Sequence, residues 1–222
     1  MADLPKALRD LCAGQRGVVT RTQLLDGGLT PAAVRWHAGR GWRVLLPSVY
    51  LLGRDEPTAD QRLVAALLWA GPRSVLAGPT AARWYGITAA EPRGTVHFLV
   101  PQPQRSRSRG FAVVRRTLLH DPAVRRQGAL RLSSPARAAV DAAHAARSPD
   151  ARSAILIEVV QRRLATIDDV AEWVHRLRTR DSARLQAPLA AAASGAWSVP
   201  EAELLELMAT SRELPEAWAN PV

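Results

Sequence analysis

The sequence predicts an α+β protein. It is expected to begin with a winged helix-turn-helix, continue into a small mixed sheet with helices, and end in a helical C-terminal region. Three observations support this prediction. Two helix-start signatures follow one another near the N-terminus, two short strands come directly after them, and strand-like and helix-like segments alternate further on. We expect an N-terminal domain at 1–53, an α+β middle domain at 58–195 and a C-terminal helix at 198–222.

The first helix-start signature surrounds Thr20. Thr20 is a candidate N-cap, and Gln23 stands three residues later, which is the spacing of a capping box. Val19 and Leu24 occupy the two positions of a hydrophobic staple, whose side chains pack together across the helix start. These residues predict a helix over about 20–26, preceded by a short amphipathic helix over 4–13.

The second helix-start signature surrounds Thr30. Thr30 is the next candidate N-cap, Pro31 fills the first helical position, and Leu29 with Val34 forms a second staple. A glycine turn at 26–28 separates this helix, over about 30–38, from the previous one. Two strands, at 42–46 and 48–52, then form a basic hairpin. This arrangement has the shape of a unit that enters the major groove of DNA.

In the middle region, predicted strands alternate with predicted helices, and the region after about residue 134 is predicted to be helical. Thr58 is a candidate N-cap for a helix to residue 70, and Ser134-Pro135 begins an alanine-rich helix to about 147. Strands are expected at 74–77, 95–100, 111–116 and 130–133, and further helices at 79–85, 149–163, 167–178 (capped by Thr166), 181–193 and 199–212.

The charge of the chain favours a polyanionic partner. The net charge is +10, and the segment 101–137 holds nine arginines against one acid. A GC-rich genome, which raises arginine throughout a sequence, is the alternative explanation. Residues 198–222, however, hold five glutamates against one arginine. A uniform bias would not leave an acidic end. The basic regions are therefore interpreted as a specific feature of this protein rather than a result of genome composition.

The helix at 30–38 is the candidate recognition helix. Val34 and Ala38 are expected to point inward, which leaves Ala32, Trp36 and Arg40 on the opposite face and Arg35 at its edge. Arginine bridges guanine O6 and N7 or holds phosphate, and a small alanine can approach a thymine methyl. The expected DNA-binding residues are Thr20, Arg21, Thr22, Gln23, Thr30, Ala32, Arg35, Trp36, Arg40 and Arg43.

Phosphate contacts are expected on both sides of this helix. Thr20, Arg21 and Thr22 are predicted to hold phosphate through hydroxyls, backbone N–H groups and the helix dipole. Arg43, in the strand pair, is predicted to reach the adjacent backbone or the minor groove. A small three-helix unit that contacts proteins is the alternative, since a fold does not determine a function.

A secondary basic patch follows the strand at 95–100. Arg105, Arg107 and Arg109 alternate with serine, and we expect them to attract phosphate without sequence preference. The alternative is a solvated hairpin loop. No catalytic motif, metal-ligand spacing or cofactor fingerprint is found, so we expect no enzyme activity, no metal and no cofactor. Cys12, the single cysteine, is interpreted as a core residue, and without a membrane span the protein is expected in the cytoplasm.

Five runs of the sequence carry a family resemblance. They are Gly17–Leu25, Leu29–Arg35, Leu46–Leu52, Val75–Gly86 and Leu132–Ala142. Together they resemble the AbiEi antitoxin family, the antitoxin-regulators of type IV toxin–antitoxin systems, in its diverged actinobacterial form. The similarity covers roughly residues 5–195, and Ser48 stands where many relatives carry glycine. The resemblance implies a transcription regulator that binds double-stranded DNA at its own promoter, with a middle domain that adds DNA contacts or couples to a partner such as a toxin.

The C-terminal residues carry a second resemblance. Val199–Leu207 is similar to the opening helix of a very-short-patch-repair nuclease domain, and Glu203 falls where the first acid of that domain lies. One carboxylate cannot hold a catalytic Mg²⁺, so we expect a truncated nuclease-like domain or an evolutionary remnant. Two alternatives to a regulator therefore remain: a DNA-targeted nuclease lacking its catalytic half, and a toxin-binding interaction module. The DNA site, the oligomeric state and any toxin are left open.

Overall fold

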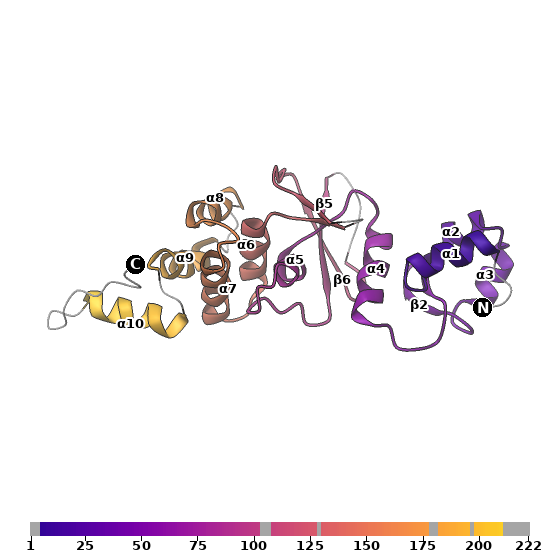
Figure 1. Cartoon of the computed structure of the whole chain (residues 1–222), viewed down its shortest axis with the longest axis horizontal. Helices are drawn as coiled ribbons and strands as arrows, with labels where there is room; N and C mark the ends of the chain where they lie inside the picture. The colour runs from indigo at the N-terminus through magenta and orange to yellow at the C-terminus, as the bar shows by residue number, and fades with distance from the viewer. Residues whose placement is uncertain (1–4, 103–107, 128–129, 178–181, 196–197, 211–222) are drawn as a thin grey trace. The chain divides into compact units, whose positions relative to one another are not determined.

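The protein is a mixed α+β structure, seen in a computed structural model that describes residues 5–102, 108–127, 130–177, 182–195 and 198–210. The chain folds into two compact units. The first comprises residues 1–74 and 94–117, and the second comprises residues 75–93 and 118–222. Figure 1 labels the helices of both units and some of the strands. The first unit thus includes 59–74 and 94–117 in addition to the first 53 residues, whereas the sequence placed a boundary after residue 53.

The first unit begins with three helices and a small sheet, and its capping residues act as predicted. The Thr20 hydroxyl accepts a hydrogen bond from the Gln23 N–H (3.1 Å), and the Gln23 side chain accepts one from the Thr20 N–H (2.9 Å). Thr30 accepts from the Ala33 N–H at 3.2 Å. The elements are α1 (Lys6–Gly14), β1 (Val18–Thr20), α2 (Arg21–Asp26), α3 (Pro31–His37), β2 (Arg43–Leu46) and β3 (Val49–Leu51).

The three strands form an antiparallel sheet in the order β1-β3-β2. Val19 of β1 and Val44 of β2 both pair with Tyr50 of the central strand. Strand β1 was not predicted, because three residues directly before a helix cap are too few to show alternation. The sheet and helices share one core, confirming Cys12 as a core residue. Its buried members are Leu8, Cys12, Val19, Leu24, Val34, Trp42 and Tyr50.

The turn between β2 and β3 contains a residue with a positive φ. Ser48 has φ +63°, in the left-handed region that favours glycine because a Cβ crowds the backbone there. The Ser48 carbonyl accepts a hydrogen bond from the Arg21 N–H at 2.8 Å. The hairpin turn is thereby tied to the first residue of α2.

The first unit continues with α4 (Ala59–Ala70), which Thr58 caps as predicted, and Gln61 completes a capping box with it. The Gln61 side chain also donates to the Arg16 carbonyl at 3.0 Å, which fastens α4 to the N-terminal elements. Strands β5 (Val96–Pro101) and β6 (Ala112–Thr117) pair in parallel. The segment between them is therefore not a hairpin loop, which corrects that interpretation of the basic patch.

The second unit is built around β4 (Val75–Leu76), β8 (Leu130–Leu132) and β7 (Arg125–Gln127). β8 pairs in parallel with β4 and antiparallel with β7, which lies at the edge. β7 was not predicted, since Arg-Arg-Gln has no strand signature. The helices are α5 (Gly78–Trp84), α6 (Pro135–Ala145), α7 (Pro149–Gln161), α8 (Ile167–Leu177), a 3₁₀ turn (Ser182–Leu185), α9 (Gln186–Ala193) and α10 (Val199–Thr210).

An ion pair is buried inside the alanine-rich helix α6. Arg137 is 1% exposed and Asp141 is 3% exposed, with 3.5 Å between Nε and Oδ2. The Arg137 guanidinium also donates to the Leu119 carbonyl at 3.0 Å and lies 4.6 Å from the ring centroid of Trp173. This arginine therefore joins α6, α8 and the segment that follows β6. Among the described residues, no helix combines the length and apolar character needed to cross a membrane.

Candidate nucleic-acid interface

The exposed face of α3 carries the residues predicted for base contacts. Val34, 1% exposed, anchors the helix in the core of the first unit. Residues on the other side of the helix, Ala32, Arg35 and Trp36, are exposed, and Trp36 keeps 60% of its surface open. Among the described residues, the Arg35 side chain has no hydrogen-bond or ion-pair partner. α3 therefore presents an unengaged guanidinium beside a protruding indole.

Trp36 packs against His37, which in turn packs against a buried tryptophan. The His37 ring stacks on the buried Trp42 ring, with 4.5 Å between centroids and 16° between planes. The Trp36 ring is perpendicular to the His37 ring, with 4.8 Å between their centroids. Because Trp42 belongs to the core, this contact limits the motion of an otherwise exposed side chain. The stack was not predicted, and only the short spacing of residues 36, 37 and 42 hints at it.

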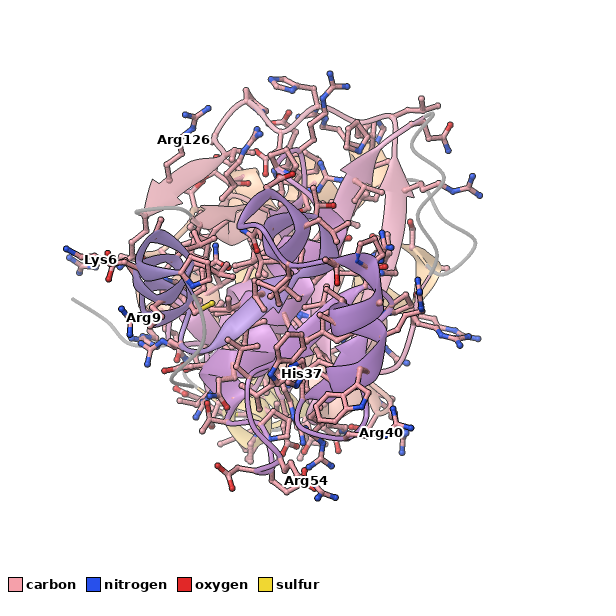
Figure 2. The ribbon with its side chains drawn as sticks, turned by 90° about the vertical axis from the view of Figure 1, so that its right-hand side faces the viewer. Lys6, Arg9, His37, Arg40, Arg54 and Arg126 are labelled. Atoms are coloured by element: carbon pink, nitrogen blue, oxygen red, sulfur yellow. The ribbon has the colours of Figure 1, made fainter. Side chains whose placement is uncertain are left out.

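Arg40 lies beside Trp36 rather than within the helix. Its guanidinium stands 6.0 Å from the Trp36 ring centroid and donates to the Trp36 carbonyl at 3.3 Å. α3 ends at His37, so Arg40 belongs to the turn that follows. Figure 2 shows His37 and Arg40 on the face of the first unit that is turned to the viewer. Both side chains accompany Trp36 at the end of α3.

The start of α2 offers less to a phosphate than the sequence predicted. The backbone N–H groups of Thr20, Arg21 and Gln23 are all used, the first and third in the capping box and the second on Ser48. Thr20 and Gln23 are half-buried and hold the cap with their side chains. The Arg21 guanidinium and the exposed Thr22 hydroxyl are the groups left to contact a backbone.

The Arg43 side chain is engaged by residues that follow β3. Its guanidinium forms an ion pair with Glu56 at 2.5 Å and donates to the Asp55 carbonyl at 3.3 Å and the Arg54 carbonyl at 3.5 Å. These partners belong to the segment between β3 and α4. The sequence could not reveal them, because they lie 11–13 residues away along the chain.

Four predicted residues remain, of which two belong to the described part of the first unit. Thr30 is exposed, and its hydroxyl accepts the capping hydrogen bond from the Ala33 N–H. Arg109 is exposed in the segment after β5. Arg105 and Arg107 lie outside the described residues. Seven exposed basic residues in the described part of the first unit were not among the predicted set. They are Lys6, Arg9, Arg16, Arg54, Arg73, Arg115 and Arg116. Lys6 and Arg9 project from a different side than Arg40 (Figure 2).

Carboxylates and histidines do not gather into a metal site in the described part of the chain. No group of three or more His, Cys, Asp or Glu side chains there has the arrangement to hold an ion. Glu203 is exposed on α10. Asp169, in the first turn of α8, instead caps that helix by accepting hydrogen bonds from the Thr166 N–H (2.9 Å) and hydroxyl (2.7 Å). The backbone hydrogen bond is the main cause of the lowered pKa of Asp169.

Comparison with known proteins yields a likeness of fold. No family model matches the chain, and no curated protein is significantly similar to it. The crystal structure of the RV2827C protein from Mycobacterium tuberculosis is similar, with a TM-score of 0.57 and 15% sequence identity. The match covers 91% of this chain and 82% of that one. At this identity the likeness concerns the fold alone.

Proposed function

We propose that this protein is a transcription regulator of the AbiEi antitoxin type, whose segment from α1 to β3 is a winged helix-turn-helix that binds double-stranded DNA. The element order α1-β1-α2-α3-β2-β3 supports the proposal, since it has two short capped helices followed by an antiparallel hairpin. In this assignment α3 is the recognition helix and the β2–β3 hairpin is the wing. The protein would act in the cytoplasm.

The observation that carries the proposal is the composition of the α3 face. A helix that contributed only to stability would not need an unengaged arginine next to an indole that is 60% exposed. In a major groove, Arg35 would bridge a guanine, while Ala32 allows close approach to the base edges. Trp36 would supply apolar contact with a thymine methyl, and its aromatic support limits the entropy lost on binding.

Affinity and specificity have separate sources in this proposal. Arg21 and Thr22 would contact the phosphate backbone, where each neutralised phosphate adds salt-dependent affinity. Arg35 and Trp36 would read the sequence. Arg43 would contribute little, because the ion pair with Glu56 already satisfies its guanidinium.

Duplex selection followed by substitution tests the proposal. Fragments bound from a random duplex pool identify a preferred site, and fluorescence anisotropy then measures Kd for that site and for scrambled DNA. Arg35→Ala is expected to raise Kd for the preferred site by about 5- to 150-fold and to change the scrambled Kd far less. Arg9→Ala is the matched control, because it removes the same charge from an exposed position on α1.

Three outcomes would contradict the proposal. Equal weakening by Arg35→Ala and Arg9→Ala would mean that α3 acts through charge alone. If the selection enriched no sequence, the protein would not recognise a specific DNA sequence. Absence of any binding at low salt would leave the first unit as a protein-interaction module, since the phosphate contribution is strongest there.

A further inference from the structure

Two arginines of the second unit face each other across neighbouring strands. Arg126 of β7 is directly opposite Arg131 of β8 in the antiparallel register. Residues in this position share one face of the sheet, with Cβ atoms about 5 Å apart. Like charges placed directly opposite one another are destabilising. The pair is therefore a cost to folding that an anionic ligand would relieve.

No ion pair balances the charge of these two arginines in the described part of the protein. The neighbouring Arg125 forms no ion pair there either. The Nε of Arg131 is buried and has no hydrogen-bond partner there. A buried donor without an acceptor is rare in folded proteins, because it loses its hydrogen bond to water without replacement. Arg126 is exposed and extends away from its strand (Figure 2).

Protection of a sheet edge does not explain both arginines. Charged side chains on edge strands commonly prevent unwanted pairing, and β7 is an edge strand. β8, however, pairs with β7 on one side and β4 on the other, so it has no free edge to protect. Arg131 therefore needs a different reason for its position.

An aromatic platform lies on the other face of the same edge strand. Because side chains alternate along a strand, Arg125 and Gln127 point away from the Arg126 face. The Gln127 side chain accepts a hydrogen bond from the Trp84 indole N–H at 2.7 Å, and the Arg125 guanidinium lies 5.6 Å from the ring centroid of Tyr85. Trp84 is 42% exposed. The edge of the sheet thus carries paired cations on one face and an orientated indole with a further cation on the other.

We infer that this edge binds single-stranded nucleic acid. The Arg126–Arg131 pair holds a backbone phosphate through charge-assisted hydrogen bonds, and an unpaired base stacks on Trp84. A single strand can turn around one edge strand and reach both faces. A duplex is too wide and stiff to do so, and its base faces are hidden in the stack. The exposed indole also distinguishes this ligand from an acidic peptide, which needs the charges but not the stacking.

Titration with labelled oligonucleotides of the full-length protein tests this inference. The probes are fluorescein-labelled oligothymidine and oligouridine of about 16 nucleotides and a duplex of equal length. Trp84→Leu is expected to weaken single-strand binding by about 5- to 150-fold. Arg126→Gln is expected to lower the magnitude of the slope of log Kd against log salt by about 0.7. Comparing the two single-stranded probes shows whether DNA or RNA is the preferred ligand.

The controls separate this site from the α3 face. Arg147→Gln removes an equal charge from another exposed position of the second unit and is expected to leave the single-strand Kd unchanged within about twofold. Arg35→Ala is expected to weaken duplex binding while keeping oligothymidine binding. Far-UV circular dichroism checks that each variant is folded. Because Arg126 is exposed, Arg126→Gln is the variant with the smallest expected effect on folding.

The inference is overturned if Arg147→Gln weakens binding as much as Arg126→Gln, or if Trp84→Leu has no effect. Equal effects of Trp84→Leu on single strands and duplex would also overturn it. Displacement of the labelled strand by oligoglutamate of equal charge as efficiently as by unlabelled oligothymidine would assign the site to an acidic peptide instead. None of these results depends on whether α3 recognises a particular duplex sequence.

Discussion

The buried pair between Arg137 and Asp141 provides a sharp test of how the second unit is held together. Replacing Arg137 with methionine keeps a side chain of similar length but removes the guanidinium. Asp141, only 3% exposed, then keeps its carboxylate without its ion-pair partner. The Leu119 carbonyl loses a charged donor at 3.0 Å, and Trp173 loses the cation beside its ring. All three effects destabilise the folded state.

The expected loss of unfolding free energy for Arg137→Met is about 3–5 kcal/mol, the range measured when one partner of a buried pair is removed. The bond to the Leu119 carbonyl accounts for about 1.5–3 kcal/mol of this, as a hydrogen bond from a charged donor. Domains of ordinary size have a total unfolding free energy of about 5–15 kcal/mol, so the variant would lose about a fifth of it or more. The double variant Arg137→Met/Asp141→Leu is expected to lose only about 1.5–3 kcal/mol, because the Leu119 carbonyl still loses its donor but no charge is left unpaired.

Urea unfolding measures these free energies. Circular dichroism and tryptophan fluorescence should be recorded together, since coincident transitions are required for a two-state analysis. The two single variants and the double variant form a thermodynamic cycle. A loss below about 1 kcal/mol for Arg137→Met, or a double variant whose loss equals the sum of the two single losses, would refute this account of the pair.

Two further predictions concern local features of the chain. Ser48→Gly is expected to raise the free energy of unfolding by up to about 1 kcal/mol, because glycine adopts φ +63° without steric strain. Urea midpoints would show it, and an unchanged or lower value would contradict it. For Asp169, hydrogen bonds from Thr166 lower the folded pKa below its usual value of 3.8. Its contribution to stability is therefore present above pH 3.8 and lost as pH falls through the folded pKa. Asp169→Asn is expected to flatten the acid side of the Tm-against-pH profile, and an unaltered profile would argue against the cap.

Local rules in the sequence were sufficient for the helix starts and for most element positions. The caps at Thr20, Thr30 and Thr58 depend on residues three positions apart, so a short window contains all the information they need. The same is true of the exposed face of α3, whose period follows from helix geometry once Val34 is placed inward. The assignment of that face to DNA is still a prediction.

Long-range contacts decided what the sequence did not show. Arg43 and Arg137 look like solvated cations in the sequence, yet one is engaged by Glu56 and the other is buried in an alanine-rich helix. Strand β7 exists because β8 supplies its hydrogen-bond partners, which also places Arg126 opposite Arg131. The sequence by itself determined the helices, their caps and the face that α3 exposes, since these follow from neighbours along the chain. Only the tertiary structure decided which arginines have partners, because a charged side chain is paired or left unpaired by residues that folding brings from elsewhere.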